Sequence, residues 1–144
     1  MTIRPRAAKS IRDIRARLRD IAAASHANTV AVRDRSRDAV VEEQQALEEH
    51  FDTAQHELLD ARSIYHLQSV DEDTGIHRLA IADAQKVLDA NTKQTQLSEA
   101  ALRESSRKLK SSEALVERIE DMLARRDAKA EQRSQDDIST RKRL

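Results

Sequence analysis

The sequence predicts an all-α protein, folded as a long two-helix antiparallel coiled-coil hairpin. With 36% charged residues, 1% aromatic residues, one glycine and one proline among 144 residues, the chain lacks the bulky side chains and turns of a compact domain. Apolar and small residues repeat at steps of three and four from Ile81 to Leu123 without a break, the spacing of a coiled coil. Abundant Ala, Leu, Arg, Glu and Gln favour such a helical rod over a disordered chain. The only glycine lies near the midpoint, where a hairpin needs its turn.

The first helix is predicted over residues 5–68. Pro5 suits a first helical turn, because its N–H is not needed there and its φ is already helical. The apolar spacing is regular at the start, loosens to consecutive steps of four between Asn28 and Gln44, and becomes regular again from Leu47. The large residues assigned to the coiled-coil core on this helix are Ile14, Leu18, Ile21, Leu47, Phe51, Leu58 and Tyr65.

The turn is predicted at residues 69–76, which contain three acids, hydroxyl residues and the single glycine. Gly75 can adopt a positive φ without steric cost. Ser69 and Glu72 also match a capping box, so the second helix could begin as early as Val70. The sequence leaves both starting points open.

The second helix is predicted over residues 77–137, followed by a frayed tail, and the whole chain is expected to be one domain. Large residues occupy one seam position and mostly small or polar ones the other, so this seam needs a complementary partner. If the chain folds back at the predicted turn, facing residues have numbers that sum to about 145, and large residues then face small ones. Leu47 would face Ser98, for example. The core residues predicted here are Ile81, Leu88, Leu102, Leu109, Val116, Ile119 and Leu123.

The residue content argues against an enzyme and against a bound cofactor, metal or small-molecule substrate. There are no cysteines and no glycine-rich phosphate loop, and the five histidines are scattered. His56 and Asp60 are four residues apart, but the surface of a two-helix rod offers no pocket where further metal ligands would converge. The longest uncharged apolar run is 21–24, too short to span a bilayer. The lack of cysteine favours the cytoplasm; an Arg-rich organellar transit peptide is the alternative.

Charge is zero in sum but unevenly placed. Basic residues dominate from Arg4 to Arg19 and recur after Leu123, so the open end of the hairpin is predicted to be positive. The half near the turn is acidic, with Asp71, Glu72 and Asp73 at the turn itself. One interpretation is solubility and pairing between the helices, because charge runs on coiled coils are usually solvated. The other is a basic end that binds an acidic partner. Nucleic acid is disfavoured, because aromatic residues that stack on bases are absent at this end and acids interrupt the tail.

The C-terminal part of the chain resembles the FliJ-like stalk proteins of the type III export ATPase, found in flagella and injectisomes. The likeness is in aliphatic heptads, then basic residues, then an acidic pair before a last helical turn. The residues that carry it are Leu115, Val116, Ile119, Leu123, Arg125, Arg126, Glu131, Gln132, Arg133, Asp136, Asp137 and Ile138.

This resemblance implies a non-enzymatic central stalk that links the ATPase ring to the export gate in the membrane. The implied partners are the export ATPase hexamer, the export gate protein and secretion chaperones, at the cytoplasmic side of the export apparatus. The implied ring-facing residues are Arg12, Arg15, Arg19, Arg125 and Arg126; the implied gate-facing residues are Asp71, Glu72, Asp73, Ile76 and Leu79. No aromatic residue stands near the start of the predicted second helix, which departs from the family pattern.

A generic coiled-coil adaptor or a self-assembling structural protein is the alternative. Leu115 and Met122 flank the seam beside Val116 and Leu123, and this wider apolar surface could recruit further helices.

Overall fold

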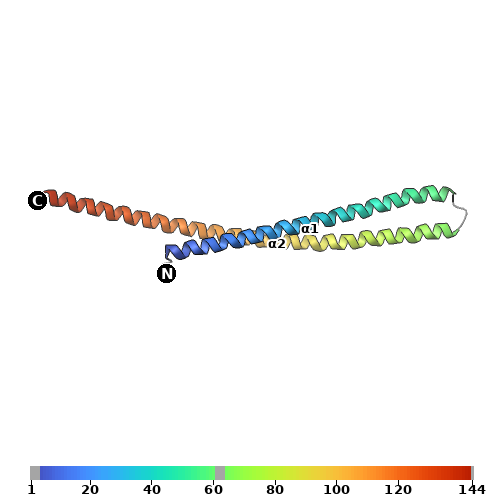
Figure 1. Cartoon of the computed structure of the whole chain (residues 1–144), viewed down its shortest axis with the longest axis horizontal. Helices are drawn as coiled ribbons and strands as arrows, with labels where there is room; N and C mark the ends of the chain where they lie inside the picture. Colours follow the sequence, from blue (N-terminus) through green and yellow to red (C-terminus); the bar gives the residue numbers. More distant parts are fainter. Residues whose placement is uncertain (1–3, 61–63, 144) are drawn as a thin grey trace. The chain divides into compact units, whose positions relative to one another are not determined.

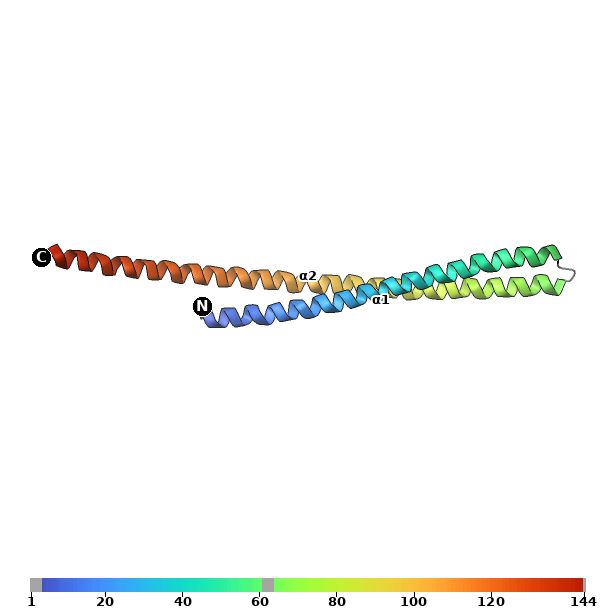
Figure 2. The same ribbon diagram turned by 45° about the horizontal axis from the view of Figure 1, so that its top comes forward.

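The chain is a helical hairpin of two long antiparallel helices (Figures 1 and 2). The structure is a computed structural model that describes residues 4–60 and 64–143, without the side chains of Leu58 and Asp60. Helix α1 spans Pro5–Asp60 and helix α2 spans Ile64–Arg143, and the described ranges contain no strand. The predicted all-α hairpin is therefore confirmed.

The two helices together make up two compact units. Unit 1 contains Met1–Ala23 and Ala101–Leu144, and unit 2 contains Ala24–Ala100. In each unit a stretch of α1 lies along a stretch of α2. Each unit therefore buries its apolar surface only between these two helices, which leaves a thin core.

Helix α1 begins where the sequence predicted. The carbonyl oxygen of Arg4 accepts hydrogen bonds from the N–H groups of Ala7, at 2.9 Å, and Ala8, at 3.1 Å. Pro5 occupies the first helical position, where it has no N–H to leave unpaired. Helix α2 ends with three basic residues in its last turn: Arg141, Lys142 and Arg143. Positive charge at this position stabilises a helix, because the C-terminal end of the helix dipole is negative.

The predicted turn at residues 69–76 is wrong. Helix α1 ends at Asp60, eight residues before the predicted end, and α2 starts at Ile64 and runs through Gly75. Gly75 has no positive φ. Thr74 is buried, and its hydroxyl donates to the Val70 carbonyl at 2.8 Å, as in a helix interior. One glycine costs a helix only about 1 kcal/mol, which the packing of neighbouring residues can offset. Residues 138–143, predicted to fray, are also helical.

The register between the helices differs from the prediction for the same reason. Thr29 bonds to Ser98 and Arg15 bonds to Ser112, so the numbers of facing residues sum to 127 instead of about 145. With α1 ending at Asp60 and α2 beginning at Ile64, this sum is about 18 lower than predicted, and the same seam of α2 still faces α1. The predicted large-against-small pairs, such as Leu47 with Ser98, are therefore not the observed ones.

The seam of α2 is confirmed from Ile81 to Ile119. Every position of its 3,4 series in this range is buried or half-buried, including the predicted core residues Ile81, Leu88, Leu102, Leu109, Val116 and Ile119. The series also continues toward the start of α2 through His77, Thr74 and Val70. Leu123 is 38% exposed, because α1 begins at Pro5 and leaves no helix to cover it.

The seam of α1 differs from the predicted one. An unbroken heptad series runs through its buried and half-buried positions: Ala8, Arg12, Arg15, Arg19, Ala22, His26, Thr29, Arg33, Ser36, Val40, Glu43, Leu47, His50 and Ala54. Five residues beside this series are half-buried as well: Ala16, Ala23, Val30, Val32 and Ala46. This series includes the predicted core residue Leu47, but it is displaced from the predicted Ile14, Leu18 and Ile21 by one residue, or about 100° around the helix. A continuous heptad avoids the local unwinding that the predicted steps of four would need.

The displacement exposes apolar residues that the sequence assigned to the core. Ile14 is 57%, Leu18 53% and Ile21 65% exposed, because their face of α1 points away from the seam. Phe51 is 45% exposed beside the seam residue His50, and Tyr65 is 79% exposed in the first turn of α2. These five assignments are wrong, whereas Leu47 is half-buried as predicted and the side chain of Leu58 lies outside the described residues.

Hydrogen bonds replace apolar contacts along much of the seam in unit 2. Ser98 bonds to His26 at 2.9 Å and to Thr29 at 2.7 Å, and Asn91 donates to Ser36 at 2.5 Å. Among the described residues no buried side-chain polar atom lacks a hydrogen-bond partner. Such bonds contribute little net stability but are costly to break singly, so they specify the pairing more than they strengthen it.

Candidate partner-binding surfaces

The arginines predicted to face a partner on α1 lie instead at the seam of unit 1. Arg15 donates from one nitrogen to the Lys108 carbonyl at 3.1 Å and to the Ser112 hydroxyl at 2.6 Å. Arg12 pairs with Asp13 at 3.1 Å and Arg19 with Asp20 at 2.8 Å. All three are half-buried, so their first role is to join α1 to α2 or to neutralise the neighbouring acid.

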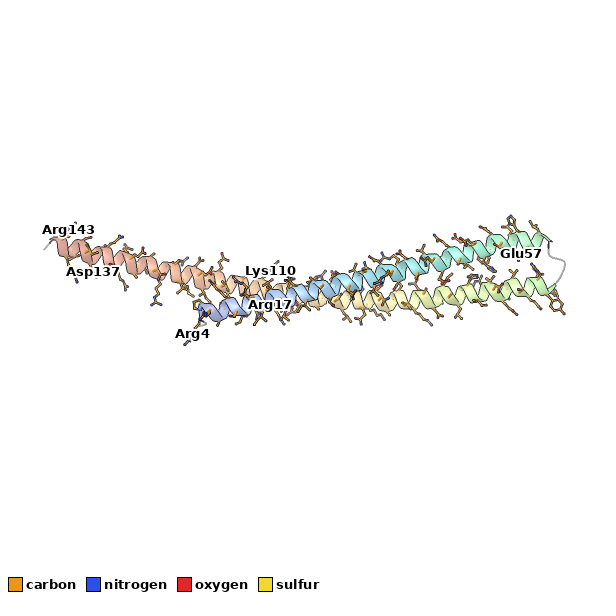
Figure 3. All side chains as sticks on the ribbon, viewed as in Figure 1. Arg4, Arg17, Glu57, Lys110, Asp137 and Arg143 are labelled. Carbon is orange, nitrogen blue, oxygen red and sulfur yellow. The ribbon has the colours of Figure 1, made fainter. Side chains whose placement is uncertain are left out.

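The open end of unit 1 is formed by α2 alone. Residues 124–143, which we call the overhang, continue past the start of α1, and every one of them is exposed. Figure 3 shows Asp137 and Arg143 on this part of α2 with no helix beside them. A single helix in water is marginal, which makes the overhang suited to gain a partner.

Arg125 and Arg126, the predicted ring-facing residues of α2, lie on this exposed helix. They belong to a shallow groove along one side of it, which we call the basic overhang face: Met122, Arg125, Arg126, Lys129, Ala130 and Arg133. The spacing of three and four places the cations around two apolar side chains, Met122 and Ala130. Such a face fits a helix or strand that carries carboxylates beside a small apolar residue.

The residues predicted to face the export gate are exposed, and they lie inside helix α2 and not in a connection between two helices. Asp71, Glu72 and Asp73 form part of a helical turn, and Ile76 and Leu79 are exposed and three residues apart on α2. Sequence reasoning missed apolar residues near the end of α1 and the start of α2: Leu59, Ile64 and Leu67 are exposed together with Tyr65. The signal for them was an apolar density around residues 58–67 greater than one seam can bury.

The histidines His50 and His56 have local hydrogen-bond partners. His50 bonds to Thr74 at 3.0 Å and its ring lies 4.9 Å from that of His77, while His56 bonds to its own helix at the Asp52 carbonyl. Across residues 4–60 and 64–143, no three His, Cys, Asp or Glu residues come together as a metal site. The Arg107 guanidinium donates to the exposed Glu104 carboxylate at 2.8 Å, which lowers the pKa of Glu104 and raises the pKa of Arg107.

No helix in the described part of the chain is long and apolar enough to cross a membrane. No protein-family model, curated protein or solved structure matches the chain. The candidate function therefore depends on the surfaces above and on the sequence resemblance.

Proposed function

We propose that this protein is a non-enzymatic stalk of a type III export ATPase, in a flagellar or injectisome system. The observation that carries the proposal is the overhang, an exposed helix that extends beyond its partner helix and bears the basic overhang face. In the proposed arrangement this helix enters the ATPase ring at the cytoplasmic side of the export apparatus. Exposed apolar residues of unit 2, including Ile76, Leu79, Ile64 and Leu67, contact the export gate or a secretion chaperone.

The proposed ring contact assigns different weights to the basic residues. Arg125 and Arg126 are free to meet acids of the ring, whereas Arg15 already bonds to α2. Each exposed ion pair contributes only about 0 to 1 kcal/mol, so binding is the sum of several weak contacts that can exchange as the ring changes state. We therefore expect an affinity that falls as salt concentration rises.

The test is ATP hydrolysis and hexamer formation by a type III export ATPase of the same organism, with and without the full chain, at low and high salt. The decisive variant is Arg125→Glu with Arg126→Glu, which changes a helix that packs against nothing and so leaves the hairpin intact. Lys86→Glu with Lys93→Glu, two exposed lysines on α2 in unit 2, is the matched control. We expect the wild type and the control to stimulate turnover or assembly, and the overhang variant to lose most of that effect.

A wild type that changes neither turnover nor assembly at low salt would remove the stalk proposal. If the variant with Arg125→Glu and Arg126→Glu stimulates the ATPase as well as the wild type, the contact with the ring does not lie on the overhang. In that case the second candidate, a coiled-coil adaptor, is favoured by the exposed apolar residues Ile14, Leu18 and Ile21.

A further inference from the structure

The N-terminal stretch of α1 carries an apolar surface that the hairpin does not use. Ile11, Ile14, Leu18 and Ile21 are all exposed and follow steps of three and four, so they form one line along the helix. We call them the outer stripe. It lies about 100° around α1 from the seam that faces α2. Helix α1 therefore has a second surface with the periodicity of a coiled-coil seam.

We propose that the outer stripe is the interface with a second copy of this chain, joining two hairpins through their unit 1 helices. The stripe consists only of isoleucine and leucine, so the same stripe on another copy offers side chains of matching size and shape at each layer. On α2, half-buried Leu115 lines a hollow together with Ile11, which widens the apolar surface across both helices of unit 1. The interface is thus a four-helix contact.

The exposed area is of the size that self-association needs. With exposures of 38% to 65%, the four stripe residues leave on the order of 400 Å² of apolar surface on each copy, a size typical of interaction patches on monomers. With Leu115 and the polar residues at the rim, two copies approach the roughly 1,200 Å² at the low end of specific interfaces. We therefore expect a dimer with a dissociation constant on the order of micromolar.

Ion pairs within the hairpin reduce the charge repulsion between two copies. The stretch is rich in arginine, but Arg12 and Arg19 pair with Asp13 and Asp20, and Arg15 is held by α2. Lys9 pairs with Glu120 of α2 at 3.0 Å. Three of the seven cations from Arg4 to Arg19 thus have an acid of the same hairpin as partner, which reduces the repulsion between two copies, whereas Arg15 keeps its charge.

Sedimentation equilibrium of the full chain, without any partner protein, tests this inference independently of the stalk proposal. We expect the wild type to show a monomer–dimer equilibrium, and Ile14→Gln with Leu18→Gln to weaken it by about tenfold or more. Glutamine is a good helix former and the two residues lie off the seam, so the helicity measured by circular dichroism should be unchanged. The matched control is Leu79→Gln with Leu97→Gln, two exposed leucines of α2 outside the stripe, and it should dimerise like the wild type.

A wild type that stays monomeric at about 100 times the expected dissociation constant overturns the inference, as does equal dimerisation by the stripe variant. A chain that is monomeric in solution but sediments with vesicles of phosphatidylserine and phosphatidylcholine, in a manner that the stripe variant loses, assigns the stripe to a membrane instead and also overturns it. Equal weakening by the control variant shows that any exposed leucine contributes, which removes the stripe as a specific site.

Discussion

Replacing Gly75 with alanine should stabilise the protein, and the sign of the change separates a helix from a turn. Gly75 lies inside α2 and is exposed, its φ is not positive, and a Cβ built on it meets no atom within 4 Å. In a helix interior, alanine makes the folded state about 1 kcal/mol more stable than glycine does. Part of this difference arises because alanine leaves the unfolded chain fewer conformations. We therefore expect Gly75→Ala to raise the free energy of unfolding by about 0.5 to 1 kcal/mol.

A turn at this position would give the opposite sign. Alanine in the left-handed conformation that a turn glycine adopts costs about 1 to 2 kcal/mol, so the two structures differ by about 2 kcal/mol in their expected effect. Ser69→Ala gives a second reading of the same question. It should be neutral or slightly stabilising within a helix, whereas loss of a capping serine would cost about 1 kcal/mol.

The measurement is urea unfolding followed by circular dichroism at the helical band, with wild type and both variants under the same conditions. With a denaturant slope of about 2 kcal/mol per molar, the expected gain moves the midpoint upward by about 0.3 to 0.5 M. Hydrogen exchange of the amides around Gly75 locates the gain, since unit 1 and unit 2 need not unfold together. If Gly75→Ala lowers the midpoint, the helix through residues 69–76 is incorrect and the turn belongs there.

Three further predictions concern the seam. Leu109→Ala should cost about 2 to 3 kcal/mol of stability, because Leu109 is only 6% exposed and about three buried carbons are removed; Leu97→Ala, at 66% exposed, should stay within about 0.5 kcal/mol, and equal costs in urea unfolding would contradict the seam. Thr29→Cys with Ser98→Cys should form a disulfide within one chain on mild oxidation, detected by mass and gel mobility, because these side chains are in hydrogen-bond contact; a product linked only between chains would argue against the register. Arg15→Ala should lower the free energy of unfolding by about 1 to 2 kcal/mol, since two hydrogen bonds to α2 are lost, and an unchanged midpoint would mean that Arg15 is not part of the seam.

The basic residues predicted to bind a partner are exposed on the overhang but half-buried on α1. The sequence identified Arg125 and Arg126 as candidate contacts from charge and resemblance, and they are exposed. It placed Arg12, Arg15 and Arg19 in the same role, because charge alone does not tell a solvated face from a polar seam. The bond from Arg15 to Ser112 depends on which residues of α2 lie opposite, and that is a property of the register.

The sequence by itself determined the all-α class and the face of α2 that packs, because an unbroken 3,4 spacing from Ile81 to Ile119 can bury only one side of a helix. It did not determine the turn or the register. The same seam of α2 can face α1 in more than one register, so the spacing does not choose between hairpins, and residues 61–63 include no glycine or proline. Only the tertiary structure decided which face of α1 meets that seam. A continuous helix keeps one face toward its partner, so α1 presents Arg15 and His26 to α2 and leaves Ile14, Leu18 and Ile21 outside, although burying the apolar residues looked more favourable for α1 alone.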